Sequence, residues 1–189
     1  MSYATLKDVK DYLSISGTGD DALISELVQA ATAAIDTYTH RTFDVTADTT
    51  RYFDAAGDHI IGNVLYLTRD LCQITTVTNG DSTEITSAQY TTIPRNETPY
   101  TAIRILSSVN VTWTYTTDYE DAISITGRWG YSIQPPYDIQ QATIRLASFY
   151  YRQKDSQLSD VTAIEAGTVI RTPAMPADVV SIIKPYRRL

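Results

Sequence analysis

Two different spacings of apolar residues divide the chain into three regions. Near both ends, apolar residues recur every three or four positions, which is the spacing of a helix with one buried face. Between residues 45 and 126, short runs alternate apolar and polar positions, which indicates β-strands. The pattern therefore predicts a helical region into which a β region is inserted.

The first 40 residues predict two helices. Thr5 and Asp8 have the spacing of a capping box, and an apolar face follows before the chain turns at SISGTG. Asp20 and Asp21 then supply acceptors and negative charge at the start of a second helix, which continues to about Tyr38. One apolar stripe of this second helix consists of Leu23, Leu27, Ala30, Ala34 and Tyr38. A second stripe beside it consists of Ile24, Val28, Ala31 and Ile35.

The middle of the chain predicts an antiparallel β structure. Asn79-Gly80 separates two strand-like runs and is typical of a tight hairpin turn. The turns recur about every ten residues, as in a small sandwich or open barrel. The expected strands are 50–54, 64–68, 73–78, 84–86, 90–93, 102–106, 111–115 and 122–128.

The stretch GRWGYSIQPPYDIQQA passes from strand to helix through an aromatic corner and two prolines. Pro136 suits the first turn of a third helix, where its missing N–H is not needed. The main apolar face of this helix consists of Ile139, Ala142, Leu146, Phe149 and Tyr150, and a lesser stripe consists of Ile144, Ala147 and Tyr151. Residues 154–175 are weakly patterned and predict extended chain. Pro176 and Pro185 then bound a short fourth helix, before the final residues YRRL.

These elements predict an α+β fold. Two N-terminal helices, a long C-terminal helix and a short terminal helix form a small bundle over residues 1–44 and 128–189, and residues 45–127 form an inserted antiparallel β sandwich or open barrel. The first stripe of the second helix is expected to be core. The second stripe is either core as well or exposed.

Charge and composition restrict the function. The chain has 22 acidic and 15 basic residues and a net charge of −7, which disfavours binding to phosphate backbones. One cysteine, Cys72, allows no internal disulfide. No run approaches the roughly 20 apolar residues that span a bilayer, so no membrane partner is expected.

The sequence contains few residue patterns that are typical of catalytic or metal-binding sites. His40 and His59 are the only histidines, neither has a ligand partner at metal-binding spacing, and no nucleophile elbow or phosphate loop is present. We therefore expect no enzyme and no catalytic, cofactor or metal site. A hydrolase would have to use Asp54 and Asp58, or the acidic cluster 118–121, which read as solvated loop charges. A carbohydrate- or protein-binding β module would use the aromatic residues Trp113, Tyr115, Tyr119 and Trp129.

Three stretches together resemble the head–tail connector (adaptor) proteins of tailed bacteriophages. They are TLKDVKDYLSISGTGDDALISELVQAATAAIDTYTHRTF, ITGRWGYSIQPPYDIQQATIRLASFYYRQKD and PADVVSIIKPYRRL. Their order is that of the family, whose smaller members are mainly helical and whose longer members carry an inserted sheet. The resemblance implies a structural virion protein of the neck, present in the host cytoplasm during assembly. It implies a ring of identical subunits, expected to number twelve, that binds the portal protein and a tail or stopper protein and lets DNA pass without specific binding.

The resemblance also assigns roles to residues. The basic aromatic end is expected to dock on the portal, the alternative being a solvated terminus, and the corner is expected to be a joint between sheet and helix. Subunit contact is expected at Ile24, Val28, Ala31, Ile35, Ile144, Ala147 and Tyr151. Portal docking is expected at Tyr186, Arg187, Arg188 and Leu189. The structural joint is expected at Gly127, Trp129, Gly130 and Pro136.

Overall fold

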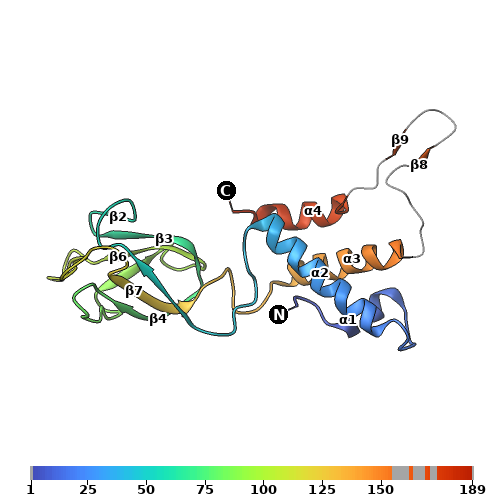
Figure 1. Cartoon of the computed structure of the whole chain (residues 1–189), viewed down its shortest axis with the longest axis horizontal. Coiled ribbons are helices and arrows are strands. Elements are labelled where there is room, and N and C mark those ends of the chain that lie inside the picture. The colour runs from blue at the N-terminus through green and yellow to red at the C-terminus, as the bar shows by residue number, and fades with distance from the viewer. Residues whose placement is uncertain (1, 155–161, 164–168, 171–173, 189) are drawn as a thin grey trace. The chain divides into compact units, whose positions relative to one another are not determined.

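The computed structural model describes residues 2–154, 162–163, 169–170 and 174–188 (Figure 1). The chain divides into two compact units. The helical unit comprises Met1–Arg41 and Pro135–Leu189, and the β unit comprises Thr42–Gln134. The corner residues 127–134 therefore group with the β unit, whereas Pro136 belongs to the helical unit.

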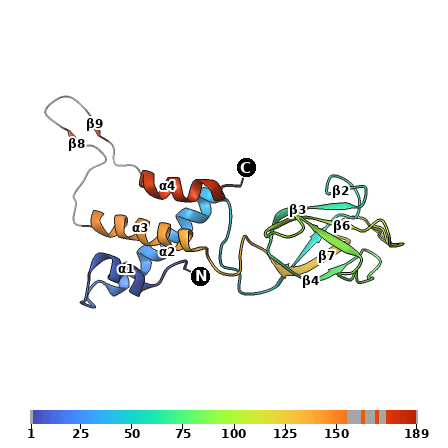
Figure 2. The same ribbon diagram turned by 180° about the vertical axis from the view of Figure 1, so that it is seen from behind.

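The helical unit contains four α-helices. They are α1 (Leu6–Leu13), α2 (Asp21–Thr39), α3 (Tyr137–Gln153) and α4 (Ala177–Ile183), and a 3-10 turn, η1 (Lys184–Tyr186), follows α4. Figures 1 and 2 show α2 and α3 side by side from both directions, with α1 and α4 against them. The predicted α+β class and the small helical bundle are confirmed.

The capping box predicted at the start of α1 is confirmed. Asp8 N donates to Thr5 Oγ1 at 3.2 Å, and Thr5 N donates to Asp8 Oδ2 at 2.8 Å. Asp20 behaves differently from the prediction for α2, because its side chain caps no backbone N–H. Its Oδ2 instead accepts hydrogen bonds from Tyr151 Oη at 2.5 Å and Lys154 Nζ at 2.8 Å, at the other end of the unit's sequence. Asp20 thus joins the start of α2 to the end of α3.

The β unit consists of two antiparallel sheets that share one core. Phe53, Val77 and Ile125 come from one sheet and Leu65 and Ile103 from the other, and all are buried in the same cluster. The arrangement is a sandwich, and the described strands close no barrel. One sheet has the order β1-β7-β4, with bounds Thr49–Phe53, Ile123–Arg128 and Gln73–Thr78. The other has the order β2-β3-β6-β5, with bounds Ile60–Ile61, Val64–Leu71, Tyr100–Ile105 and Tyr90–Ile93.

Two predicted strands are reduced to isolated bridges. Residues 84–86 contribute one bridge, between Thr78 and Glu84, and residues 111–115 contribute another, between Gly80 and Tyr115. The tight turn predicted at Asn79-Gly80 is also wrong, because the chain reverses over residues 79–83, with Asn79 N donating to Thr83 O at 2.8 Å. Ser82, not Gly80, takes the left-handed conformation there, at φ 65°. The wider turn frees the Asn79 side chain for other contacts.

A third, short pair of strands, β8 (Thr162–Ala163) and β9 (Val169–Ile170), lies within the region predicted to be extended. The rest of that prediction falls on residues outside the described ranges, as does Leu189. Over the described residues, no helix combines the length and apolar character needed to cross a membrane.

Candidate functional site

The corner after β7 fixes the path by which the chain leaves the β unit. Tyr131 N donates to Thr42 O at 2.8 Å, Ser132 Oγ donates to Phe43 O at 3.1 Å, and Val45 N donates to Ser132 O at 3.3 Å. The outgoing segment is thereby paired with the incoming one. Of the predicted joint residues, Gly127, Trp129 and Gly130 lie inside the β unit near this crossing, and a role in holding sheet to helix stays a prediction.

Close packing explains the two glycines of the corner. A Cβ on Gly127 would lie 2.2 Å from Gln73 O, and a Cβ on Gly130 would lie 2.3 Å from Val45 Cγ2. Both distances are shorter than non-bonded contacts of a Cβ atom in proteins, so a side chain at either position would clash. Trp129 lies between them and is 7% exposed. Its ring packs on Phe53 with a centroid distance of 5.7 Å, and its Nε1 donates to Thr49 O at 3.0 Å. Trp129 is therefore a core residue of the β unit.

Pro136 caps α3 from the helical unit. Its φ of −54° and ψ of 151° are extended, and its carbonyl oxygen accepts the first helical hydrogen bond, from Gln140 N at 3.0 Å. Gln140 Nε2 also donates to Pro135 O at 2.8 Å. The two prolines therefore define where α3 begins, as the sequence predicted.

The expected subunit-contact stripes are not exposed. Ile24, Val28, Ala31, Ile35, Ile144 and Ala147 are all buried inside one helical unit. The expectation that these six side chains face another subunit is wrong, because each is already buried within a single chain. Tyr151 remains half-buried, and its hydroxyl is bound to Asp20. The exposed side of α2 is the other stripe, in which Ala30 is exposed and Leu27 and Ala34 are half-buried.

The C-terminal residues are held on the helical unit. Arg188 N donates to Thr39 O at 2.9 Å, and the Arg187 guanidinium lies 5.8 Å from the centre of the Tyr38 ring. Tyr186 is likewise bound, through Asp138. The alternative of a solvated, frayed terminus is therefore wrong for residues 186–188. Portal docking by these residues stays a prediction.

The carboxylates considered for a hydrolase lie on turns. Asp54 Oδ1 accepts a hydrogen bond from Asp121 N at 2.9 Å, so the two acidic regions do meet, but through the backbone of one of them. Asp58, Asp118 and Glu120 are exposed. Among the described residues, no group of three His, Cys, Asp or Glu side chains could hold a metal ion.

Cys72 is a buried thiol. Its Sγ donates to Arg128 O at 3.3 Å, and burial raises the pKa of the thiol above its ordinary value. A raised pKa lowers the thiolate fraction, which is the reactive form. The geometry therefore fits a structural role.

The aromatic residues proposed for a binding face do not share one surface. Trp113 packs against the core and Trp129 is buried in it, whereas Tyr115 and Tyr119 are exposed. The two tyrosines form an edge-to-face pair with a centroid distance of 6.1 Å. The exposed aromatic surface on this side is thus one tyrosine pair.

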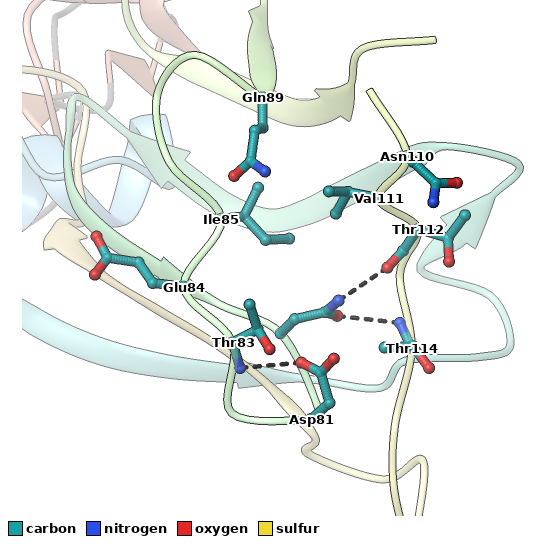
Figure 3. Close-up of a pocket in the computed structure, with 10 residues that line it drawn as sticks. Asp81, Thr83, Glu84, Ile85, Gln89, Asn110, Val111, Thr112 and Thr114 are labelled. Carbon is teal, nitrogen blue, oxygen red and sulfur yellow. Dashed lines mark hydrogen bonds between the residues drawn. The ribbon is translucent and has the colours of Figure 1, made fainter. Parts of the chain in front are cut away.

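Figure 3 shows a pocket in the β unit, beside the 79–83 turn. The volume of the pocket is 270 Å³. Asn79, whose side-chain role the sequence did not reveal, lines the pocket and is buried. Its Nδ2 donates to Thr112 O at 2.8 Å, and its Oδ1 accepts from Thr114 N at 3.0 Å and Gly80 N at 3.1 Å. The amide thus replaces a strand partner for the segment 112–114. Asp81 and Gln89 are also engaged by backbone N–H groups, so the polar lining mainly stabilises turns.

Comparisons with known proteins agree on the fold. A chain in the neck of an empty gene transfer agent particle, computed with C6 symmetry, has a TM-score of 0.60 and 18% identity, covering 97% of this chain and 88% of that one. A chain in the neck of the native particle, computed with C12 symmetry, has a TM-score of 0.58, 16% identity and the same two coverages. A chain of the native virion has a TM-score of 0.53 and 18% identity, and the match covers 97% of this chain and 89% of that one. A search of curated proteins finds no significant match.

The family match and the likeness to these neck chains together define a structural head–tail connector protein. Within that class, the chain belongs to the head completion protein family, whose model matches residues 3–189. The resemblance drawn from the sequence alone is therefore confirmed.

Proposed function

We propose that this chain forms a closed ring at the neck of a virion, between the portal and the tail. The single observation that carries the proposal is the family match over residues 3–189. The likeness of the fold to neck chains, in particles with C6 and C12 symmetry, supports a ring of twelve copies. Assembly occurs in the host cytoplasm, and the mature location is the head–tail interface.

The partners follow from this position. One face of the ring binds the portal protein, with the C-terminal residues as the docking element, and the other receives a tail or stopper protein. DNA passes through the ring without specific binding. The net charge of −7 per copy supports this, because an acidic wall repels phosphate groups. The role is structural, without catalysis or a cofactor.

Electron microscopy of the full chain mixed with portal protein tests the proposal. We expect a closed ring of twelve copies stacked on the portal. Portal particles that carry no ring, even when the chain is added at concentrations far above those in an infected cell, would contradict the proposal. A ring with another number of copies would contradict the stoichiometry alone.

A second function, recognition of carbohydrate or protein by the β unit, has one supporting observation. The exposed pair of Tyr115 and Tyr119 offers a small aromatic surface. Binding of host-cell polysaccharide by the full chain, lost in Tyr115→Ser, would establish it. No binding by the wild-type chain would remove it.

A further inference from the structure

A small basic pocket opens in the helical unit between α1, the C-terminal half of α3 and the start of α4. Its volume is 180 Å³. Arg145, Ser148 and Arg152 line it from α3, because spacings of three and four residues lie on one side of a helix. Tyr12 and Asp178 line the other sides. Two cations and one anion give the pocket a net positive charge.

Two of the residues that line this pocket each carry a buried polar atom that lacks a hydrogen-bond partner within the described part of the chain. The two atoms are Oγ of Ser148, a residue that is 2% exposed, and Nε of Arg145. Thr143 on the same helix donates to Ile139 O at 2.8 Å, which is the usual solution for a buried helical hydroxyl, whereas Ser148 does not use it. An unpaired buried hydroxyl destabilises the fold, because the hydrogen bonds that it made to water are lost and not replaced. A ligand that accepts a hydrogen bond from the hydroxyl offsets this loss.

The donors suit one carboxylate. Arg145 Nη1 lies 3.0 Å from Asp178 Oδ2, which leaves its Nε for another acceptor, and Arg152 is exposed, with no ion pair or hydrogen bond to any described residue. A carboxylate has two oxygens that accept from guanidinium and hydroxyl groups at the same time. Because Asp178 cancels one of the two positive charges, a monoanion fits the pocket better than a phosphate dianion.

The helical unit itself presents a carboxylate with no partner. Glu26 is exposed on α2 and has no hydrogen bond or ion pair among the residues described, whereas every other described carboxylate of the unit has at least one. Its neighbours one turn away, Ala22 and Ala30, are small and exposed. They leave room for another chain to approach the Glu26 side chain.

We propose that the Glu26 carboxylate of one copy occupies the pocket of the adjacent copy, accepting hydrogen bonds from Arg145, Ser148 and Arg152. This inference rests on the proposed ring, in which each contact joins two different surfaces of neighbouring copies. The pocket and Glu26 lie on different helices and so can serve as those two surfaces. The pairing would make assembly sensitive to charge at both positions.

Charge reversal in the full chain tests the pairing. Glu26→Arg and Arg152→Glu should each raise the concentration needed for ring assembly on the portal at least about tenfold, and the double variant should recover most of the loss. Glu97→Arg and Arg104→Glu, at exposed positions of the β unit, are matched controls and should have no effect. Single variants that match the controls, or a double variant no better than the worse single one, would overturn the pairing.

Ser148→Ala separates a binding role from a packing role. Its midpoint of unfolding should stay unchanged or rise, because the hydroxyl is unpaired in the free chain, while assembly should weaken about fivefold or more. Lower stability with unchanged assembly would overturn the role of Ser148.

A small carboxylate probe tests the pocket without the ring. N-acetylglutamate amide should shift the NMR signal of the Arg145 Nε–H in the wild-type chain, and inorganic phosphate at equal concentration should shift it less. No shift with the probe, or a larger shift with phosphate, would overturn the carboxylate site. Absence of rings on the portal would instead overturn the proposed function and the Glu26 pairing, while this measurement would still decide the pocket.

Discussion

Tyr186 and Asp138 join the last turn of the chain to the first turn of α3: the Tyr186 hydroxyl donates to Asp138 Oδ2 at 2.6 Å. The contact is one of several that hold residues 186–188 on α2 and α3. The described C-terminal residues therefore hold a fixed position on the helical unit. A docking element that is already ordered loses less conformational entropy on binding than a free arm.

The first prediction separates docking from anchoring at the C-terminus. Arg187→Ala should weaken binding to the portal with little change in stability, because Arg187 is exposed and its ring contact with Tyr38 is weak. Tyr186→Phe should instead lower the free energy of unfolding by about 0.5–1.5 kcal/mol. Surface plasmon resonance on immobilised portal and urea unfolding measure the two effects. Unchanged portal binding by Arg187→Ala would remove Arg187 from the docking element.

The second prediction concerns Trp129 in the corner. Trp129→Ala should destabilise the β unit by about 3–5 kcal/mol, because it removes a large side chain from the core together with the hydrogen bond to Thr49. Trp129→Phe keeps most of the packing and should cost clearly less. Urea unfolding followed by tryptophan fluorescence of Trp113 measures both. A loss below about 1 kcal/mol in Trp129→Ala would show that the side chain is not core.

Local patterns in the sequence predicted local structure well. The Thr5–Asp8 capping box and the start of α3 at the prolines depend on residues a few positions apart, and both are present. Both apolar stripes of α2 are visible in the sequence, but their burial is not. The second stripe, for which core and exposed positions both stayed open, is buried, whereas the first, expected to be core, is half-buried or exposed. The spacing of apolar residues along α2 does not reveal which of its sides is buried. That depends on α3, which lies about 100 positions further along the chain.

The third prediction concerns Asn79, whose side chain makes two hydrogen bonds to residues 112–114 and a third within the 79–83 turn, to Gly80 N. Asn79→Ala should lower the free energy of unfolding by about 2–3 kcal/mol, because it leaves buried backbone groups without partners. Asn110→Ala, at an exposed position beside the same pocket, is the control and should change stability by less than about 0.5 kcal/mol. Equal effects of the two substitutions would contradict the role assigned to the amide.

Contacts of this kind explain what the sequence did not reveal. Asn79-Gly80 has the composition of a tight hairpin turn, and only the distant segment 112–114 supplies the carbonyl and N–H groups that make a wider turn better. The pocket around Ser148 likewise combines three helices. Neither the wider turn nor the pocket can be recognised from residues that are adjacent in the sequence.

The fourth prediction concerns pH. Hydrogen bonds from Lys154 and then Tyr151 lower the pKa of Asp20 below its ordinary value of 3.8. A carboxyl group whose pKa is lower in the folded chain stabilises that chain above its unfolded pKa, and the contribution is lost as the pH falls through the folded pKa. Stability should therefore drop below about pH 4, and less so in Asp20→Asn and in Lys154→Gln. Urea unfolding at several pH values measures this, and a wild-type pH dependence in both variants would contradict it.

The paired backbone of residues 42–45 and 131–132 has a consequence for how such chains diversify. The β unit leaves the bundle and returns to it through two neighbouring segments, so the helices need no rearrangement to accommodate whatever is spliced between them. Recombination could therefore exchange this module for another of different size while retaining the parental bundle.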